Sequence, residues 1–578
     1  MKRAHHFMGW FMVCFCLLAS CNLRAETTAS PTSLPVRPSP SEETILPTTP
    51  LASYSPPEHR IGIRVVNGVG EFYDRVTNEK FIPRGMNYVH LGPQTNPYGQ
   101  SATFHAVFDP DKYDSARVGA ALKRMHDDGY NVVRVFLSQN TIGTANDGLS
   151  EAYMKNIADF LTLAKQNQIY VMFTQDWLPG GKYDTLIGSD CCIQFNLMNL
   201  NYLSPAGLDA NVAFFKDFVQ GLIDQQASLD AIFSYELRNE MFYETNQPPL
   251  SLTQGKITAA NGKVYDMASA QDKEQMVNEN LVYWINSVRA AIIEEDPTAL
   301  VSVGFFHPQK PNPARMGDPR LAVTEPAIWQ SQADFIDLHA YPGFELNLKQ
   351  YVENFGVKDM QQKPVLMGEF GGEVSRFPSI DAAAQGFVNW QVESCKFGFD
   401  GWIFWTWDDV EEPGFFNALA EDGKIEKALA PVTRPDACSA GTGANAPTDL
   451  ALNASVKASH SLPDQPAAYA VDGALETQWG SGSGPTQWIE INLGKPATIT
   501  GIRLTVAQYP NGGTTHQVWA RGASGNLKLV HEFKGDTADN QTLEFNFDTP
   551  LKDIQYIRVV TTQSPSWVSW KEIEVFGQ

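Results

Sequence analysis

Two glutamates stand directly after short apolar runs that have the character of buried strands. Residues 231–237 are mostly apolar and lead into Asn239 and Glu240, and a second run at 363–368 leads into Glu369 and a glycine turn. Strands of a parallel sheet are apolar along their length, and polar groups gather at their carboxyl ends. Two carboxyl groups that face each other across a sugar can serve as acid/base and nucleophile in glycoside hydrolysis. The two glutamates are therefore our candidates for that chemistry.

Strand-like and helix-like segments alternate between residues 60 and 430. The strand-like segments are 81–87, 131–136, 169–176, 231–237, 300–304, 335–341, 363–371 and 401–405. The helix-like segments are 116–128, 151–166, 210–225, 272–295 and 379–395. This α/β alternation predicts a parallel (β/α)8 TIM barrel, in which the active site lies at the carboxyl ends of the strands. A hairpin at 61–74, turning at Asn67-Gly68, is expected before the first strand.

The sequence pattern changes after residue 430. Residues 431–447 form a second linker, rich in Pro, Gly, Ala and Thr. From 448 to 578 no helical period is sustained, and short alternating runs occur at 488–492, 498–505, 516–520, 528–533, 543–547, 556–561 and 572–576. Such spacing predicts an antiparallel β-sandwich.

The first 21 residues have the pattern of a secretory leader. A basic start precedes an apolar run at 7–18, which is shorter than the about 20 residues of a membrane span. Residues 18–21 resemble a bacterial lipobox, which would make Cys21 a lipidated amino terminus; the alternative is ordinary cleavage near Ala25. Residues 22–59 are rich in Pro, Ser and Thr and predict an extended linker. We expect a bacterial protein that is secreted or held on the cell surface by this lipid alone.

Charge and cysteine content narrow the choice of partners. The chain has 65 acidic and 43 basic residues and a formal net charge of −22, which argues against nucleic-acid binding, because that binding neutralises phosphates with Lys and Arg. The chain contains no Cys-x-x-Cys spacing, so we expect no zinc site of that kind. One disulfide and free buried thiols both fit the cysteines outside the leader, which are Cys191, Cys192, Cys395 and Cys438. Adjacent cysteines such as the first two seldom pair with each other.

The predicted strand ends carry a known combination of residues. In strand order these are Arg134, Asn239, Glu240, His339, Tyr341, Glu369 and Trp405. On these residues, 60–430 resembles glycoside hydrolase family 5, in the retaining clan A of (β/α)8 enzymes. Trp407 could take the place of Trp405 in this pattern.

The resemblance implies the role of each catalytic group. Glu369 is expected to be the ionised nucleophile, with its charge stabilised by Arg134 and Tyr341. Glu240 is expected to protonate the leaving oxygen and then to act as base on water. It must start protonated, which partial burial near a second carboxylate favours.

Substrate contacts are implied for Arg134, Asn239, His339, Tyr341 and Trp405. An amide can bond the sugar 2-hydroxyl, and an indole face can stack on the ring. Many family members have a histidine at the end of the third strand, where this chain has Gln175 and Asp176, and either residue could replace that contact. Other candidates for the cleft, from position alone, are Asn87, His90, Trp177, Phe306 and His307.

Residues 448–578 resemble the discoidin, or coagulation factor 5/8 type C, domain, which overlaps the family 32 carbohydrate-binding modules. The stretches 470–479, 487–494 and 570–577 carry the resemblance, which implies a galactose-binding-like jelly roll with Trp479 and Trp488 in its core. It also implies a structural calcium held by Asp472, Thr477 and Glu572; the alternative is that these residues only cap a turn. Sugar contacts from Tyr509, His460 and Trp567 are inferred from their loop positions, and a structural or protein-binding role is the alternative.

Together these features predict a retaining hydrolase of β-linked polysaccharide, with β-glucan or β-mannan as substrate. The alternatives are a retaining hydrolase of another β-glycoside or glycoconjugate, and a non-catalytic carbohydrate-binding protein. We expect no cofactor in catalysis, a polysaccharide or oligosaccharide as partner, and a monomer.

Overall fold

A computed structural model describes residues 56–577, apart from 97–98, 147, 189, 192, 306–319, 322–324, 343–345, 358–361, 375, 378, 409–413, 440–447 and 474–476. The expected leader with Cys21, most of the first linker, Cys192, Phe306 and His307 lie outside the described residues.

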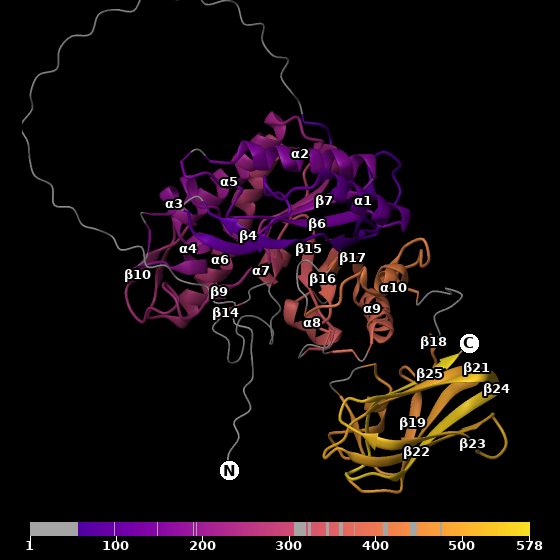
Figure 1. The fold of residues 1–578 in the computed structure, drawn as a ribbon. Coiled ribbons are helices and arrows are strands. Elements are labelled where there is room, and N and C mark those ends of the chain that lie inside the picture. The colour runs from indigo at the N-terminus through magenta and orange to yellow at the C-terminus, as the bar shows by residue number, and fades with distance from the viewer. Residues whose placement is uncertain are drawn as a thin grey trace, which may run out of the picture. The chain divides into compact units, whose positions relative to one another are not determined.

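Parallel strands with helices around them form the first large unit (Figure 1). The strands are β3 (Arg84–Asn87), β6 (Val132–Leu137), β7 (Tyr170–Gln175), β8 (Ile232–Glu236), β12 (Val301–Ser302), β13 (Gly304–Phe305), β15 (Ile336–His339), β16 (Val365–Gly371) and β17 (Phe399–Trp405). β12 pairs with β8 and β13 pairs with β15, and only Val303 separates these two short strands. They are therefore two halves of one strand that closes the sheet, and the predicted (β/α)8 barrel is confirmed.

The five expected helices are present at nearly the expected bounds. They are α1 (Ser115–Asp127), α2 (Glu151–Gln166), α5 (Pro205–Asp224), α6 (Ala270–Glu295) and α9 (Ile380–Ser394). At the start of each one the preceding Asp or Ser side chain accepts a backbone N–H, which satisfies a donor that the helix leaves open. The helices that were not predicted are α3 (Lys182–Ile187), α4 (Leu197–Leu203), α7 (Glu325–Gln330), α8 (Leu348–Phe355) and α10 (Ala420–Leu429). All five are at most ten residues long, so that each offers only a few positions from which an apolar period can be read in the sequence.

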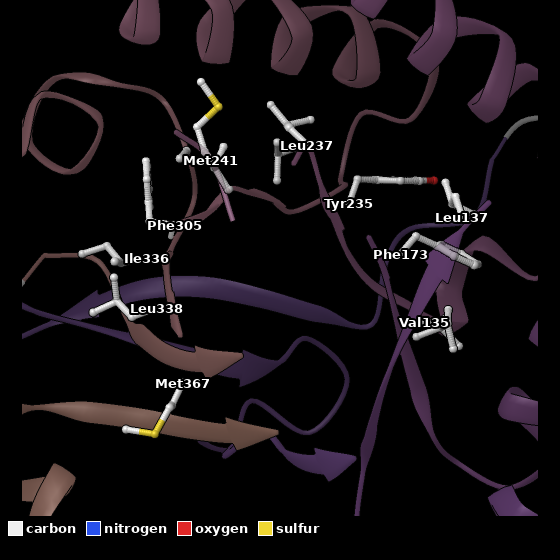
Figure 2. Close-up of a cluster of buried hydrophobic side chains, with 14 of the residues drawn as sticks. Val135, Leu137, Phe173, Tyr235, Leu237, Met241, Phe305, Ile336, Leu338 and Met367 are labelled. Carbon is white, nitrogen blue, oxygen red and sulfur yellow. The ribbon is translucent and has the colours of Figure 1, made fainter. Parts of the chain in front are cut away.

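The core of the barrel unit lies between the strands and the helices. Figure 2 shows strand residues of this layer, including Val135, Phe173, Tyr235, Leu338 and Met367. Side chains alternate between the two faces of a strand, so the residues between them, such as those at 134 and 174, face the barrel interior. Apolar residues fill the interior near the amino ends of the strands, and polar residues lie toward the carboxyl ends.

The amino-terminal hairpin closes one end of the barrel. It consists of β1 (Ile61–Val66) and β2 (Val69–Asp74), and it turns at Asn67 and Gly68 as predicted, where φ is 53° and 86°. Ile61 and Phe72 are fully buried against apolar residues from the barrel strands, which are Val132, Met172, Phe233, Leu366 and Ile403. The hairpin thus seals the end opposite the polar strand ends.

Three small two-stranded sheets occur in the long loops. They are β4 (Leu91–Thr95) with β5 (Ser101–His105), β9 (Tyr243–Glu244) with β14 (Arg320–Leu321), and β10 (Lys256–Thr258) with β11 (Val264–Asp266). The first follows β3, and parts of the other two follow β8. These elements were not predicted, and they stiffen loops beside the carboxyl ends of the strands.

A disulfide joins Cys395 to Cys438, with the Cα atoms 5.7 Å apart. It ties the end of α9 to the segment that follows α10. The hypothesis of free thiols is therefore wrong for these two residues, and Cys191 is disulfide-bonded as well. In the described part of the chain, no helix is both long and apolar enough to cross a membrane.

The carboxyl-terminal unit is an antiparallel β-sandwich, as predicted. Its strands are β18 (Thr448–Asp449), β19 (Ser455–Ala458), β20 (Trp479–Gly480), β21 (Gln487–Val506), β22 (Gly512–Arg521), β23 (Lys528–Thr537), β24 (Thr542–Gln563) and β25 (Ser569–Gly577). β21 and β24 are long and pair along both halves, with shifts of register between the halves. Trp479 and Trp570 are buried in the core, whereas Trp488 is only half-buried and packs under the guanidinium of Arg558. The prediction that Trp488 is a core residue was therefore wrong.

Candidate functional sites

Arg134 lies at the centre of the polar end of the barrel. Its side chain is fully buried and donates to both oxygens of Glu236, at 2.7 and 3.1 Å. It also donates to Oε1 of Glu369 at 2.7 Å, and to the amide oxygens of Asn87 and Asn239 at 2.8 Å each. A planar guanidinium with five donors suits such a convergent site. Arg134 thereby fixes four groups that come from three strands, β3, β8 with the residues that follow it, and β16.

Glu369 lies on β16 with little exposure, 6% of its side chain. Besides the bond from Arg134, its Oε2 accepts a hydrogen bond from the Tyr341 hydroxyl at 2.6 Å. Burial raises the pKa of Glu369, and His339, Arg134 and the Tyr341 bond oppose that rise. The sequence-based expectation named only the stabilising partners, whereas burial has the larger effect on this pKa.

Glu240 follows β8 and is more open, with 29% of its side chain exposed. Its φ is 45°, a left-handed conformation that is rare outside glycine. The bonds from Asn239 N to Gln175 O and from Met241 N to Gly304 O hold the chain on both sides of Glu240. Such backbone geometry is kept where the surrounding structure fixes it, often at functional sites.

His339 lies between the two candidate catalytic carboxyls. Its Nδ1 is 3.4 Å from Glu240 Oε1 and 3.4 Å from Glu369 Oε2. Burial alone would lower the pKa of this imidazole, but Glu369 and Glu240 raise it to about 9. Oxygens of the two glutamates and the His339 nitrogen all lie within 4.8 Å of one another. The structure therefore brings together the two glutamates and four of the five predicted contact residues.

Trp405, the fifth, belongs to a small cluster with Phe136, Tyr341 and Phe415 at the same end of the barrel, and it is 7% exposed. Its ring packs edge-on against Phe136, with centroids 5.9 Å apart. Trp407 instead packs into the core between strands and helices, near Arg124. The placement favours Trp405 over Trp407 as the indole of the candidate site.

The residues proposed from position alone have varied surroundings. Asn87 belongs to the Arg134 network, and His90 pairs with Asp408 at 3.2 Å. Asp176 forms an ion pair with Arg238, whose guanidinium lies 4.9 Å from the Trp177 ring. Gln175 is 1% exposed, and neither polar atom of its side chain has a partner among the described residues.

Two buried carboxyl groups at this end were missed in the sequence. Glu236 and Asp337 are both fully buried in strands. The one available signal was a charged residue inside each of the apolar runs 232–237 and 335–338, because charged side chains are seldom fully buried without a partner. Strand alternation then places Glu236 on the same face as Ser234, and Asp337 on the same face as His339.

The sandwich has a cleft of about 700 Å³. Tyr509 and Trp567 line it and are 89% and 59% exposed. The other lining residues are Gln478, Gly484, Pro485, Ala507, Gln508, Asp539, Ser564, Pro565, Ser566 and Ser569. His460 does not line this cleft, and its Nδ1 lies 2.7 Å from the Ser481 carbonyl oxygen. Flat aromatic faces beside small polar groups suit a sugar ring.

The residues expected to hold calcium lie close together. The Thr477 hydroxyl is 2.9 Å from both carboxylate oxygens of Asp472, and Gly473 N donates to Oε2 of Glu572 at 3.2 Å. Glu572 is 3% exposed, and its Oε1 has no hydrogen-bond partner among the described residues. Burial, together with the nearby Asp449 and Asp472, raises the pKa of Glu572 well above its usual value. An all-oxygen set with an unpartnered buried carboxylate oxygen fits a calcium ion.

A (β/α)8 barrel with paired carboxyls at its strand ends, followed by an antiparallel sandwich with an aromatic cleft, defines the class of glycoside hydrolases with an appended binding module. Residues 95–411 match the family described as cellulase, glycosyl hydrolase family 5, and the chain belongs to this family. Residues 455–573 match the F5/8 type C domain. The protein is thus a glycoside hydrolase that acts on polysaccharide.

Solved structures resemble each unit. The exo-β-1,4-mannosidase Op5Man5 from Opitutaceae bacterium strain TAV5 shares 16% identity, with a TM-score of 0.44 over 67% of this chain and 64% of that one. The family 32 module of C. perfringens NanJ, in complex with galactose, shares 24% identity and has a TM-score of 0.20 over 22% of this chain and 93% of its own. Chitosan-binding module 1 of a Paenibacillus sp. IK-5 chitosanase/glucanase shares 28% identity, with a TM-score of 0.20 over 22% and 99%. No curated protein matches the chain.

Proposed function

We propose that the protein cleaves β-linked glucan or mannan with retention of anomeric configuration. The spacing of the carboxyls carries the retaining part of this proposal, because oxygens of Glu240 and Glu369 lie within 4.8 Å of each other. Retaining enzymes have carboxyls about 5–5.5 Å apart, whereas inverting enzymes need about 6.5–9.5 Å to admit a water.

In the proposed reaction Glu369 attacks the anomeric carbon while Glu240 protonates the leaving oxygen. Arg134 and Tyr341 keep Glu369 anionic and aimed, since each donates a short hydrogen bond to it. Glu240 then takes a proton from water, which attacks the anomeric carbon and releases Glu369. In the proposal Asn239, whose amide oxygen accepts a hydrogen bond from Arg134, bonds the sugar 2-hydroxyl. His339 and Trp405 provide further contacts to the sugar in this proposal.

The test uses the full chain with a panel of β-glucans, β-mannans and aryl β-glycosides. NMR of the first product should show the anomeric configuration of the substrate, and Glu369→Gln should lower turnover by at least about a thousandfold while it leaves binding intact. Inversion, or wild-type turnover by the variant on an authentic substrate, would refute the proposed mechanism. Failure to release any chromogenic aglycone would favour the alternative of a non-catalytic binding protein.

For the sandwich we propose a sugar-binding cleft at Tyr509 and Trp567 and a calcium ion held by Asp472, Thr477 and Glu572. The exposed aromatic faces support the first role, and the unpartnered Glu572 oxygen supports the second. Binding by the module would raise the local concentration of substrate for the attached barrel. A secreted or lipid-anchored location, from the leader and Cys21, completes the proposal.

A further inference from the structure

The barrel interior holds two carboxyl groups that the proposed reaction does not use. Oxygens of Glu236 and Asp337 lie within 4.8 Å of each other and of a ring nitrogen of His339, and the His339 Nε2 is 4.0 Å from Glu236 Oε1. Glu236 is held by Arg134 and by the Thr174 hydroxyl, at 2.5 Å. Among the described residues, neither oxygen of Asp337 nor the His339 Nε2 has a hydrogen-bond partner. Three polar groups therefore converge behind the candidate site.

Two glycines make room for this cluster. A Cβ atom at Gly304 would lie 2.2 Å from Glu236 Oε1 and 3.0 Å from His339 Nε2. A Cβ atom at Gly368 would lie 2.1 Å from Asp337 Oδ1. Because real Cβ atoms essentially never approach so closely, a side chain at either position would force a neighbouring carboxyl group to shift. The glycines of β13 and β16 thus leave the space that the buried cluster occupies.

The other side of His339 faces the catalytic pair equally. Its Nδ1 is 3.4 Å from an oxygen of each glutamate. In a double displacement the negative charge begins on Glu369 and moves to Glu240 when the ester forms and the leaving oxygen takes the proton. It returns to Glu369 when water gives a proton to Glu240 and the ester breaks. A cation at this position would stabilise both states of the enzyme.

Charge balance indicates what keeps His339 positive. Among the described residues, the charged and titratable groups around it are Arg134 on β6, Glu236 on β8, Glu240 after β8, Asp337 on β15, Tyr341 after β15 and Glu369 on β16. When the buried carboxyls of Glu236, Asp337 and Glu369 are all ionised, three negative charges face the two cations Arg134 and His339. One extra proton restores neutrality, and Asp337 can hold it because its oxygens have no donor bound to them. When Asp337 gives up that proton, its charge favours the imidazolium.

We propose that the His339 imidazolium stabilises the negative charge on Glu369 and on Glu240 in turn. Asp337 is the positioning residue that keeps His339 protonated. This inference rests on the proposed double displacement. Burial raises the pKa of Asp337 to about 7, so that the carboxyl is neutral below that pH and anionic above it. Its support of His339 is therefore strongest on the alkaline side.

The test is Asp337→Asn in the full chain, with kcat and kcat/KM measured from pH 5 to 10. On an activated aryl β-glycoside, kcat reports hydrolysis of the glycosyl-enzyme and kcat/KM reports its formation. The alkaline limbs of both kcat and kcat/KM should move to lower pH by about one unit, which is about a tenfold loss of rate at a fixed alkaline pH. Rates at pH 5–6 and KM should stay near wild type, since the amide resembles the neutral acid in shape.

Several outcomes would overturn the proposal. They are an unmoved alkaline limb, an equal loss at every pH, a shift in kcat/KM alone, and a stoichiometric metal ion in wild type that the variant lacks. Asp296→Asn is the matched control, because Asp296 is buried and bonds His59 and Tyr235 instead; it should lower stability without moving either limb. If Asp337→Asn does not fold, Asp337→Ser is measured in the same way. Turnover by Glu369→Gln would refute the proposed function itself, whatever Asp337 does.

Discussion

At the scale of single residues, the candidate site is organised around the buried guanidinium of Arg134. Burial alone would lower the pKa of Arg134, but Glu236 and Glu369 raise it above its usual value, so that the guanidinium stays charged. Replacing one partner of such a network would leave a buried charge unpaired, which is costly. The positions of the remaining groups follow from this centre.

Tyr341→Phe tests how Glu369 is kept anionic. The change removes a 2.6 Å hydrogen bond that lowers the pKa of Glu369. That pKa should therefore rise, and the acid limb of kcat/KM should move to higher pH, because the nucleophile must be ionised. A bond to a charged group is worth about 1.5–3 kcal/mol, or roughly 10–100-fold in rate below the new limb. An unchanged acid limb would mean that Tyr341 does not act on Glu369.

How far the sequence predicts the site differs from residue to residue. Glu240, Glu369 and Arg134 were found because strand ends converge in a parallel barrel. Asp337 and Glu236 were missed because a charged residue inside an apolar run signals only that a partner exists, and those partners come from other strands. The choice between Trp405 and Trp407 depended on packing against Phe136 and Arg124, which is not encoded in nearby sequence.

At the scale of elements, the hairpin β1–β2 should contribute to stability and not to turnover. Phe72 is fully buried, with its ring 5.3 Å from Phe233 and 5.2 Å from Phe335. Phe72→Ala should lower the free energy of unfolding by about 3–5 kcal/mol, while kcat at low temperature stays near wild type. Denaturant unfolding and a rate assay on the same sample check this. Val69→Ala, at an exposed site on the same strand, is the control.

Calcium should stabilise the sandwich. Adding calcium should raise its melting temperature by several degrees, because a ligand at 100 times its Kd adds about 2.7 kcal/mol. Calorimetry with calcium or a chelator measures the effect. Asp472→Asn should abolish it, whereas Asp464→Asn, at an exposed site in the same unit, should not. Equal melting temperatures with and without calcium would support the alternative that these residues only cap a turn.

The helices and strands were predicted correctly where the apolar pattern extended over a long segment, or where the residues of a turn were specific to one turn type. The eight barrel strands and the Asn67-Gly68 hairpin were placed to within a few residues. The fifth strand was expected as one piece, but it is interrupted at Val303, because its two halves pair with different neighbours. The small sheets in the loops were not predicted, since strands of two to five residues carry almost no periodic signal.

At the scale of the whole molecule, the two units should contribute separately to polysaccharide hydrolysis. Trp567→Ala should weaken binding of the full chain to its polysaccharide by about tenfold, the loss expected for one aromatic anchor. Hydrolysis of a soluble aryl glycoside should not change, because that substrate needs only the barrel. Pull-down on insoluble polysaccharide and the rate assay give the two readouts. Tyr469→Ala, an exposed aromatic outside the cleft, serves as control.

The sealed amino-terminal end of the barrel has a consequence for how such an enzyme can diverge. Substitutions around Phe72 and Ile61 would alter the thermal stability of the protein, whereas insertions in the loops at the carboxyl ends of the barrel strands would alter its selectivity for substrates. The two properties could then be optimised by separate rounds of laboratory selection, and their gains should combine additively in one variant.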